Sequence, residues 1–179
     1  MVMQSSDTVA IIYASTSGNT EAVVEHVARH WQPKISSTLH RAEQTKSDVI
    51  TDHQFFILAT STWEHGVLNP FFSRLYAEVT ELDLSDKQAA FIGLGDRRYE
   101  PVLFCEGMEK LRQLWLKKGG TEIGTALKIQ GEPYSQLERA VTPWAETISS
   151  ILTTGQSGAI KQPLQHSSLL SVLKRSFTV

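Results

Sequence analysis

The stretch V-A-I-I-Y-A-S-T-S-G-N-T-E, which runs from Val9 to Glu21, decides the fold class. Its first part, Val9–Ala14, is a short apolar and partly β-branched run, which is typical of a strand buried on both faces of a sheet. Apolar residues then recur at helical spacing over Asn19–Trp31. The stretch therefore predicts a strand, a short loop and a helix in direct succession.

The same alternation continues along the rest of the chain. We predict further strands near Lys34–Leu39, over Gln54–Thr60, over Gln88–Gly95 and near Thr121–Ile129. Helices are predicted around Pro70–Val79, from about Phe104 to Lys118 and near Ser135–Leu152. Strands that alternate with helices imply right-handed βαβ units, and so a parallel sheet with helices on both faces. Such sheets bind ligands at the carboxyl ends of the strands, where the strand order reverses.

Chain length predicts one domain followed by an extension. With 179 residues the chain is long enough for one full core and too short for two comfortable domains, so we assign residues 1–152 to a single domain. Residues 153–179 are predicted to form a linker, Thr153–Pro163, and a short amphipathic segment. We expect that segment to dock as a helix on the domain's own surface. The alternatives are docking on a partner and lying on a membrane surface, for which its two cations are few.

Composition excludes several classes of function. The formal net charge is −2, from 17 Lys and Arg against 19 Asp and Glu, which gives no support to a nucleic-acid partner. The single cysteine, Cys105, excludes an internal disulfide and a cysteine-cluster metal site, and we expect no metal. No run of about 18 apolar residues is present, so no membrane span is expected. Because the first residues lack the basic and apolar stretches of a signal peptide, we expect a cytoplasmic protein, and we expect a monomer.

The loop S-T-S-G-N-T-E, Ser15–Glu21, has the groups that a phosphate site needs. Hydroxyl groups, the Asn19 amide and backbone N–H groups at a helix start can surround an anion, and Gly18 admits a conformation closed to residues with a Cβ. The loop holds no Lys or Arg, unlike a Walker A loop, so a monophosphate ester held by neutral donors fits better. The alternative is an ordinary Ser/Thr-rich helix cap, with Glu21 favouring the helix start.

Three loops together resemble those of the flavodoxin family. They are S-T-S-G-N-T-E after the first strand, T-S-T-W (Thr60–Trp63) after the third and G-L-G-D-R-R-Y-E (Gly93–Glu100) after the fourth, in the family's order. The likeness covers roughly Val9–Ile151, and the chain is similar to short-chain members because it lacks the long insertion in the fifth strand. The resemblance implies a flavodoxin-like three-layer α/β sandwich, whose five-stranded parallel sheet, in the order 2-1-3-4-5, binds FMN non-covalently at its switch point.

The resemblance also implies which residues bind the cofactor. It places the phosphate at the first loop, at Ser15, Thr16, Ser17, Gly18, Asn19 and Thr20. It places Thr60, Ser61 and Thr62 beside the ribityl chain and the ring, with Trp63 and the adjoining Glu64 at one ring face and Tyr99 stacked on the other. It assigns the pyrimidine edge of the ring to Gly95, Asp96, Phe104 and Cys105.

Three of these residues have plainer interpretations. Trp63 follows an apolar run and stands in a predicted turn, and the alternative is an ordinary core tryptophan. Asp96 is otherwise a turn residue with local backbone hydrogen bonds. Cys105 is otherwise a small buried packing residue.

Two departures from the family pattern bear on the cofactor. Glu64 stands where members often carry a glycine at a peptide that flips on reduction, so we expect the flip to cost about 1 kcal/mol more and the semiquinone to be less stable. Arg97 and Arg98 stand where small polar residues are common. They either raise the potential of the second electron from beside the ring, or point into solvent, where screening removes most of the effect.

The resemblance implies an electron-transfer protein rather than an enzyme. It implies a low-potential one-electron carrier that takes electrons from a flavodoxin/ferredoxin reductase-type donor and passes them to acceptor enzymes in transient complexes. Aromatic rings and carboxylates near the flavin agree with a low potential, because they disfavour added negative charge. The alternative is an NAD(P)H:quinone-type flavoenzyme on the same fold, which usually needs an inserted pocket above the ring. A receiver domain, a cysteine phosphatase and a binding module without FMN fit the loops less well.

Overall fold

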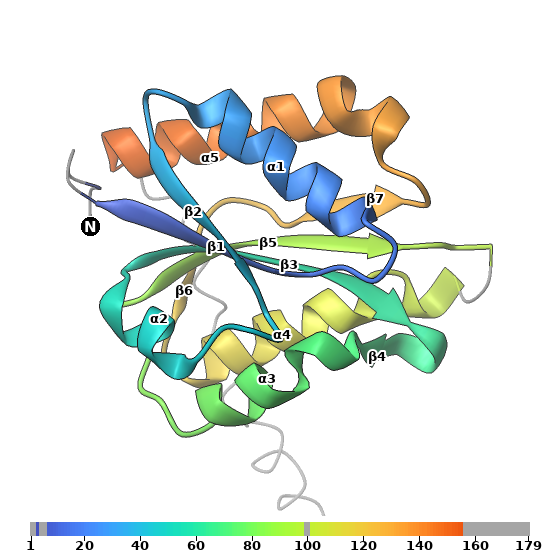
Figure 1. Ribbon diagram of the computed structural model, residues 1–179, viewed down its shortest axis with the longest axis horizontal. Helices are drawn as coiled ribbons and strands as arrows, with labels where there is room; N and C mark the ends of the chain where they lie inside the picture. The colour runs from blue at the N-terminus through green and yellow to red at the C-terminus, as the bar shows by residue number, and fades with distance from the viewer. Residues whose placement is uncertain (1–2, 4–6, 99–100, 156–179) are drawn as a thin grey trace, which may run out of the picture.

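A parallel sheet forms the middle layer of the domain (Figure 1). The computed structural model describes residue 3 and residues 7–98 and 101–155. The sheet has the order β2-β1-β3-β5-β6, and these parallel strands span Ser36–Arg41, Thr8–Ala14, Phe55–Trp63, Gln88–Gly95 and Thr121–Glu122 in that order. Counted along the chain without the short antiparallel strand β4, this is the predicted order 2-1-3-4-5. The predicted fold class is confirmed.

Helices cover both faces of the sheet (Figure 1). One face carries α1 (Asn19–Trp31) and α5 (Thr142–Thr154), and the other carries α2 (Ser47–Asp52), α3 (Ser73–Val79) and α4 (Glu106–Lys117). Because both faces are covered, the central strands read as continuous apolar runs in the sequence. α1 and β5 begin and end at the residues that the sequence predicts.

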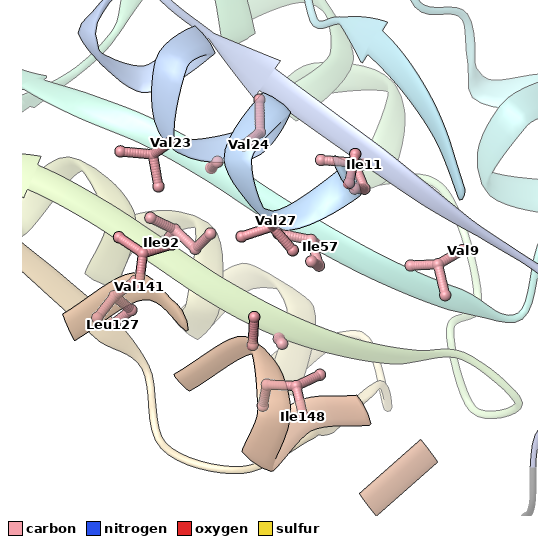
Figure 2. Close-up of a cluster of buried hydrophobic side chains, with 14 of the residues drawn as sticks. Val9, Ile11, Val23, Val24, Val27, Ile57, Ile92, Leu127, Val141 and Ile148 are labelled. Atoms are coloured by element: carbon pink, nitrogen blue, oxygen red, sulfur yellow. The ribbon is translucent and has the colours of Figure 1, made fainter. Parts of the chain in front are cut away.

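Side chains that alternate along the strands build two apolar cores. Figure 2 shows Ile11, Ile57 and Ile92 from three neighbouring strands packed with Val27 of α1 and Ile148 of α5. The strand residues between them face α2, α3 and α4 instead. Burial of each such side chain contributes about 1.5–3 kcal/mol. These two layers hold the strands at fixed positions beneath their loops.

Two short strands fill the fifth position of the sheet. The sequence predicts a single strand near Thr121–Ile129, but β6 ends at Glu122 and β7 spans Leu127–Gln130. Both pair with β5, β6 at its start and β7 at its carboxyl end. Only residues 123–126 separate them, so the long insertion of long-chain flavodoxins is absent at this place.

Other differences from the sequence prediction concern short elements and boundaries. α2 and β4 (Val67–Leu68) are too short to show a hydrophobic period, and neither is predicted from the sequence. β3 runs three residues past its predicted end, and α4 begins two residues after its predicted start. Single turns of 3₁₀ helix span Glu64–Gly66, Pro70–Phe72, Pro101–Leu103 and Tyr134–Gln136, and a π-helical turn spans Leu137–Val141.

The C-terminal end of α5 bears on the predicted domain boundary. α5 continues to Thr154, where Gly155 ends it with a left-handed φ of 63°. The helix therefore extends two residues into the predicted linker. The predicted amphipathic segment lies outside the described residues. No helix of the described part of the chain is long and apolar enough to cross a membrane.

A buried ion pair ties α4 to the edge strand β6. The Glu122 side chain is only 2% exposed, and Arg112 donates to both of its oxygens, from Nη2 at 2.7 Å and from Nε at 2.9 Å. The hydrogen bond to Glu122 is the main cause that holds the Arg112 pKa above its usual range. Because an unpaired buried carboxylate is strongly unfavourable, the pair fixes this edge of the sheet against the helix.

We expect Arg112→Met to lower the free energy of unfolding by about 3 kcal/mol, because the Glu122 carboxylate is left buried without its partner. Lys128→Met is the matched control. Lys128 pairs with Glu109 at 2.8 Å but is 40% exposed, so its loss should cost less than about 1 kcal/mol. Urea unfolding measures both variants, and equal losses would contradict the importance of the buried pair.

Candidate functional site

The three predicted loops meet at one edge of the sheet. β3 pairs in parallel with β1 on one side and β5 on the other, with Ala14 beside Thr60 and Ser61 beside Leu94. Neighbouring strands lie about 4.8 Å apart, so the loops that follow them are neighbours in space. The strand order also reverses here, because β2 and β3 lie on opposite sides of β1. The structure therefore brings the predicted loops together at the switch point.

The first loop keeps hydrogen-bonding groups without protein partners. Gly18 is left-handed (φ 85°), and α1 begins at Asn19 with no side chain capping its N-terminus. The Ser15 hydroxyl is buried and has no hydrogen-bond partner, while Thr16 and Ser17 are exposed. An uncapped helix start with an orphaned hydroxyl in the preceding loop is suited to an anion. The alternative interpretation, an ordinary Ser/Thr helix cap, is wrong.

Trp63 lies neither in a turn nor in the core. It is the last residue of β3, where it pairs with Val67 of the antiparallel strand β4, and this pairing extends β3 beyond its predicted end. Its side chain is 43% exposed, whereas Trp31 and Trp115 are at most 2% exposed. A large apolar ring held half in water beside the loops is available to stack on a flat ligand.

Asp96 organises the third loop. Arg98 donates to its carboxylate from the backbone N–H at 2.9 Å and from Nε and Nη2 of the guanidinium, and Gln130 of β7 donates from Nε2 at 2.8 Å. These hydrogen bonds, those of Arg98 first, hold the Asp96 pKa well below its usual range. Asp96 is therefore more than a turn residue, since it joins the end of β5 to β7.

Both arginines of the third loop are exposed, yet each is held by a neighbouring side chain. Arg98 pairs with Asp96, and the Arg97 guanidinium lies 4.3 Å from the centre of the Phe104 ring. Both guanidiniums are thus exposed to solvent, as one of the two interpretations expects, and each also contacts a neighbouring side chain. The charge of Arg98 is compensated within the loop. Tyr99, assigned to the second ring face, lies outside the described residues.

Comparison with known proteins places the chain in a family. Its sequence matches the family model described as flavodoxin over residues 11–144. The chain belongs to the flavodoxin family. Flavodoxins are electron-transfer flavoproteins rather than enzymes, which gives the three loops a class of function.

Flavodoxin relatives agree in sequence and in structure. The chain is 31% identical over 133 residues to a probable flavodoxin 2 of Bacillus subtilis, covering 73% of this chain and 86% of that protein. Flavodoxin 2 from Bacillus cereus matches with a TM-score of 0.73 at 26% identity, covering 80% of this chain and 98% of that one. A Fusobacterium nucleatum flavodoxin bound to flavin mononucleotide matches with a TM-score of 0.64 at 20% identity, over 80% and 96% of the two chains. The prediction of a short-chain flavodoxin is confirmed.

The three hydroxyls at the end of β3 differ in how they use their protons. The Oγ of Ser61 accepts a hydrogen bond from Nδ2 of Asn69 at 2.8 Å, which leaves its own proton for another acceptor. Thr60 is wholly buried and donates to the Ser61 carbonyl at 3.1 Å. The Thr62 hydroxyl accepts from the backbone N–H of Gly107 in α4 at 3.1 Å. The Thr60 hydroxyl therefore uses its proton within the protein, whereas the hydroxyls of Ser61 and Thr62 both accept and so keep a proton for another acceptor.

Two amide side chains that the sequence did not predict as site residues stabilise the site. Asn69 is fully buried and also accepts from the backbone N–H of Phe71 at 3.0 Å. Its place before Pro70 is a helix-start signal that could have revealed its capping role, although not its contact with Ser61. Gln130 accepts from the backbone N–H of Arg97 at 3.1 Å, in addition to its bond with Asp96. No local pattern marks Gln130, because the partners of its side chain lie more than thirty residues away.

The turn Glu64–Gly66 has a left-handed backbone at His65 and Gly66, with φ of 56° and 70°. Lys110 of α4 donates to the Gly66 carbonyl at 2.7 Å, and a Cβ on Gly66 would lie 3.0 Å from the Glu106 side chain. The turn is thereby held closely against α4. In this conformation the non-glycine residue in the left-handed region is His65, not Glu64. The expected cost of a flip at Glu64 stays a prediction.

Phe104 and Cys105 pack directly beneath the end of β5. A Cβ on Gly93 would lie 2.9 Å from that of Cys105, and one on Gly95 would lie 2.9 Å from the Cys105 backbone N, so both glycines permit this approach. Cys105 is fully buried, and burial raises the pKa of its thiol to about 12. Its interpretation as a packing residue is confirmed, which leaves only its backbone for a cofactor. Within the described ranges, no three His, Cys, Asp or Glu side chains are grouped to hold a metal ion.

We expect His65→Gly to raise the free energy of unfolding by about 0.5–1 kcal/mol, because glycine adopts the left-handed conformation without the penalty of a Cβ. Glu64→Gly is the matched neighbour. Glu64 has no left-handed φ, so glycine there adds unfolded-state entropy and should lower stability by a similar amount. Urea unfolding of the flavin-free protein measures both. Equal losses in the two variants would show that the turn is not strained at His65.

Proposed function

We propose that this flavodoxin binds FMN non-covalently where the three loops meet, and carries electrons one at a time as a low-potential carrier. The observation that carries the proposal is the first loop, which combines an uncapped start of α1 with an orphaned Ser15 hydroxyl. We also propose a flavodoxin/ferredoxin reductase-type donor, acceptor enzymes bound in transient complexes, a monomeric state and a cytoplasmic location.

The first loop fits the phosphate of FMN. The first backbone N–H groups of α1 have no partner within the helix, and the positive end of the helix dipole favours an anion there. The hydroxyls of Ser15, Thr16 and Ser17 add neutral donors, and Gly18 turns the chain into the helix. A site that lacks Lys and Arg suits a single monoester phosphate better than a polyphosphate.

The ends of β3 and β5 fit the flavin ring and its ribityl chain. Trp63 can cover one ring face and exclude water from it, and the Ser61 hydroxyl has a proton to donate. Gly95 and the hydrogen-bonded Asp96 lie at the end of the neighbouring strand, where backbone groups can meet the ring edge. Bound FMN supplies the one-electron chemistry, while the chain supplies position, charge and shelter from water.

Exposed apolar side chains near these loops support a carrier that hands electrons to partners at its surface. Trp63 is 43% exposed, Val67 is 49% exposed and Val102 is 91% exposed. Apolar side chains of this kind suit brief docking of a partner protein. Such docking would bring a partner next to the residues that would hold FMN, which would supply the one-electron chemistry.

Three measurements test the proposal directly. The protein mixed with FMN should bind one flavin per chain with quenched flavin fluorescence, and should accept electrons from a reductase. With NADPH and a quinone alone, turnover should be negligible. Rapid quinone reduction without an added reductase would overturn the carrier in favour of the flavoenzyme, and failure to bind FMN would overturn both.

We expect Trp63→Ala to weaken FMN binding about tenfold or more, because an aromatic contact contributes about 0.5–1.5 kcal/mol beyond the area that it buries. Trp144→Phe is the matched control, since Trp144 belongs to α5 and donates to the Thr125 carbonyl at 2.7 Å. Titration of the flavin-free proteins with FMN gives both affinities. An unchanged affinity in Trp63→Ala would remove Trp63 from the site.

We expect Arg98→Ser to lower the potential of the second electron by about 20 mV, the size expected of one exposed charge at a water-like dielectric constant. The substitution leaves the Asp96 carboxylate without its ion pair, and that added negative charge opposes reduction. Asp96→Asn should shift the potential in the opposite direction. Redox titration measures both shifts, and shifts of the same sign in the two variants would contradict this electrostatic account.

A further inference from the structure

Three side chains from three elements meet beside the first loop. Tyr13 of β1 and Arg41 of β2 are register partners in the sheet, and Glu21 lies in the first turn of α1. Arg41 donates from Nη2 to both Glu21 oxygens, at 2.7 and 2.9 Å, and the Tyr13 hydroxyl donates to Glu21 Oε1 at 2.8 Å. The Arg41 guanidinium also lies 5.8 Å from the centre of the Tyr13 ring. We call these three residues the Arg41 cluster.

The Arg41 cluster is partly shielded from solvent. Tyr13 is buried, and the side chains of Glu21 and Arg41 are 27% and 38% exposed. Burial, and then the hydrogen bond to Glu21, raise the pKa of Tyr13 to about 12, so its hydroxyl stays a donor at neutral pH. A second carboxylate, that of Glu43, approaches Nη1 of Arg41 at 3.7 Å. One guanidinium thus faces two carboxylates here.

Glu21 creates an electrostatic problem for a phosphate site. Its backbone belongs to the first turn of α1, the same turn whose N–H groups face the first loop. An ionised carboxylate this close would repel a phosphate carrying nearly two negative charges, and Ser15–Thr20 contains no cation to offset it. Arg41 compensates the carboxylate from the neighbouring strand. The three-way contact also fixes the first turn of α1 relative to β1 and β2.

We propose that Arg41 is a positioning residue of the phosphate site: by holding and neutralising Glu21, it allows a loop without cations to accept the FMN phosphate. The inference rests on the proposed function, because it assumes that the first loop receives that phosphate. The inference has a specific consequence for the affinities of two flavins. Arg41 should favour FMN over riboflavin, which has the same ring but no phosphate, through its bonds to Glu21.

The test compares FMN and riboflavin affinities of the flavin-free, full-length protein by quenching of flavin fluorescence. Arg41→Met should weaken FMN binding about tenfold while riboflavin binding changes less than about twofold, because only FMN carries the charge that Glu21 repels. Glu21→Gln combined with Arg41→Met should restore most of the lost FMN affinity, since the repelling charge is removed together with its partner. Arg74→Met is the control, because Arg74 contacts Glu43, Thr45 and Glu78 and should leave both affinities unchanged.

The outcomes separate this inference from the proposed function. Equal weakening of FMN and riboflavin, no change in either, or a double variant no better than Arg41→Met would overturn the role of Arg41. If Arg41→Met does not fold, Arg41→Lys tests the inference instead, because lysine keeps the positive charge but loses the bond to both Glu21 oxygens. Its ratio of FMN to riboflavin affinity should fall about threefold, and an unchanged ratio would overturn the inference. Wild-type protein that binds neither flavin would overturn the proposed function itself.

Discussion

The position of β3, paired in parallel between β1 and β5, is the constraint on which the site depends. Parallel strands deliver their carboxyl ends to one edge, so the register that places Ala14 beside Thr60 and Ser61 beside Leu94 also places the three loops together. β3 is buried on both faces along its first six residues, and apolar layers on both sides hold it there. The polar loops contribute little to this arrangement. Because the apolar cores fix the ends of these loops, the loops can hold hydrogen-bond donors that have no partner in the protein.

Two carboxylates near the three loops are each paired with an arginine. Glu21 pairs with Arg41 of β2, and Asp96 pairs with Arg98 while Gln130 of β7 donates to it as well. In both cases the carboxylate is part of a hydrogen-bonded pair, and the pairing limits the effect of its negative charge on an anionic ligand or an added electron. The protein therefore controls the electrostatics of the site with few net charges, in keeping with a formal net charge of −2.

Local sequence patterns were sufficient for α1 and β5, because long buried runs and helical spacing are strong signals, whereas the order of the strands followed from the resemblance to the flavodoxin family. These patterns were insufficient for features that depend on a contact between residues distant in the sequence. β3 extends to Trp63 only because β4 pairs with it, and Cys105 is buried because Gly93 lets α4 approach the strand. Asn69 and Gln130 act through hydrogen bonds to other segments, which no composition or period reveals. The motif of the first loop identified the family, yet only the structure shows that no side chain caps α1.

Several features of the loop edge are unfavourable for the protein on its own. The Ser15 hydroxyl is buried without a partner, which costs about 1–3 kcal/mol, and His65 occupies a left-handed backbone region that favours glycine. Trp63 leaves apolar surface in water. Each of these lies at the carboxyl edge of the sheet, although Nε1 of Trp115 in the core is also buried without a hydrogen-bond partner. A ligand with a phosphate and a flat ring would relieve two of them at once, by accepting from Ser15 and covering Trp63. The binding energy of such a ligand thus comes in part from groups that the fold itself leaves unsatisfied.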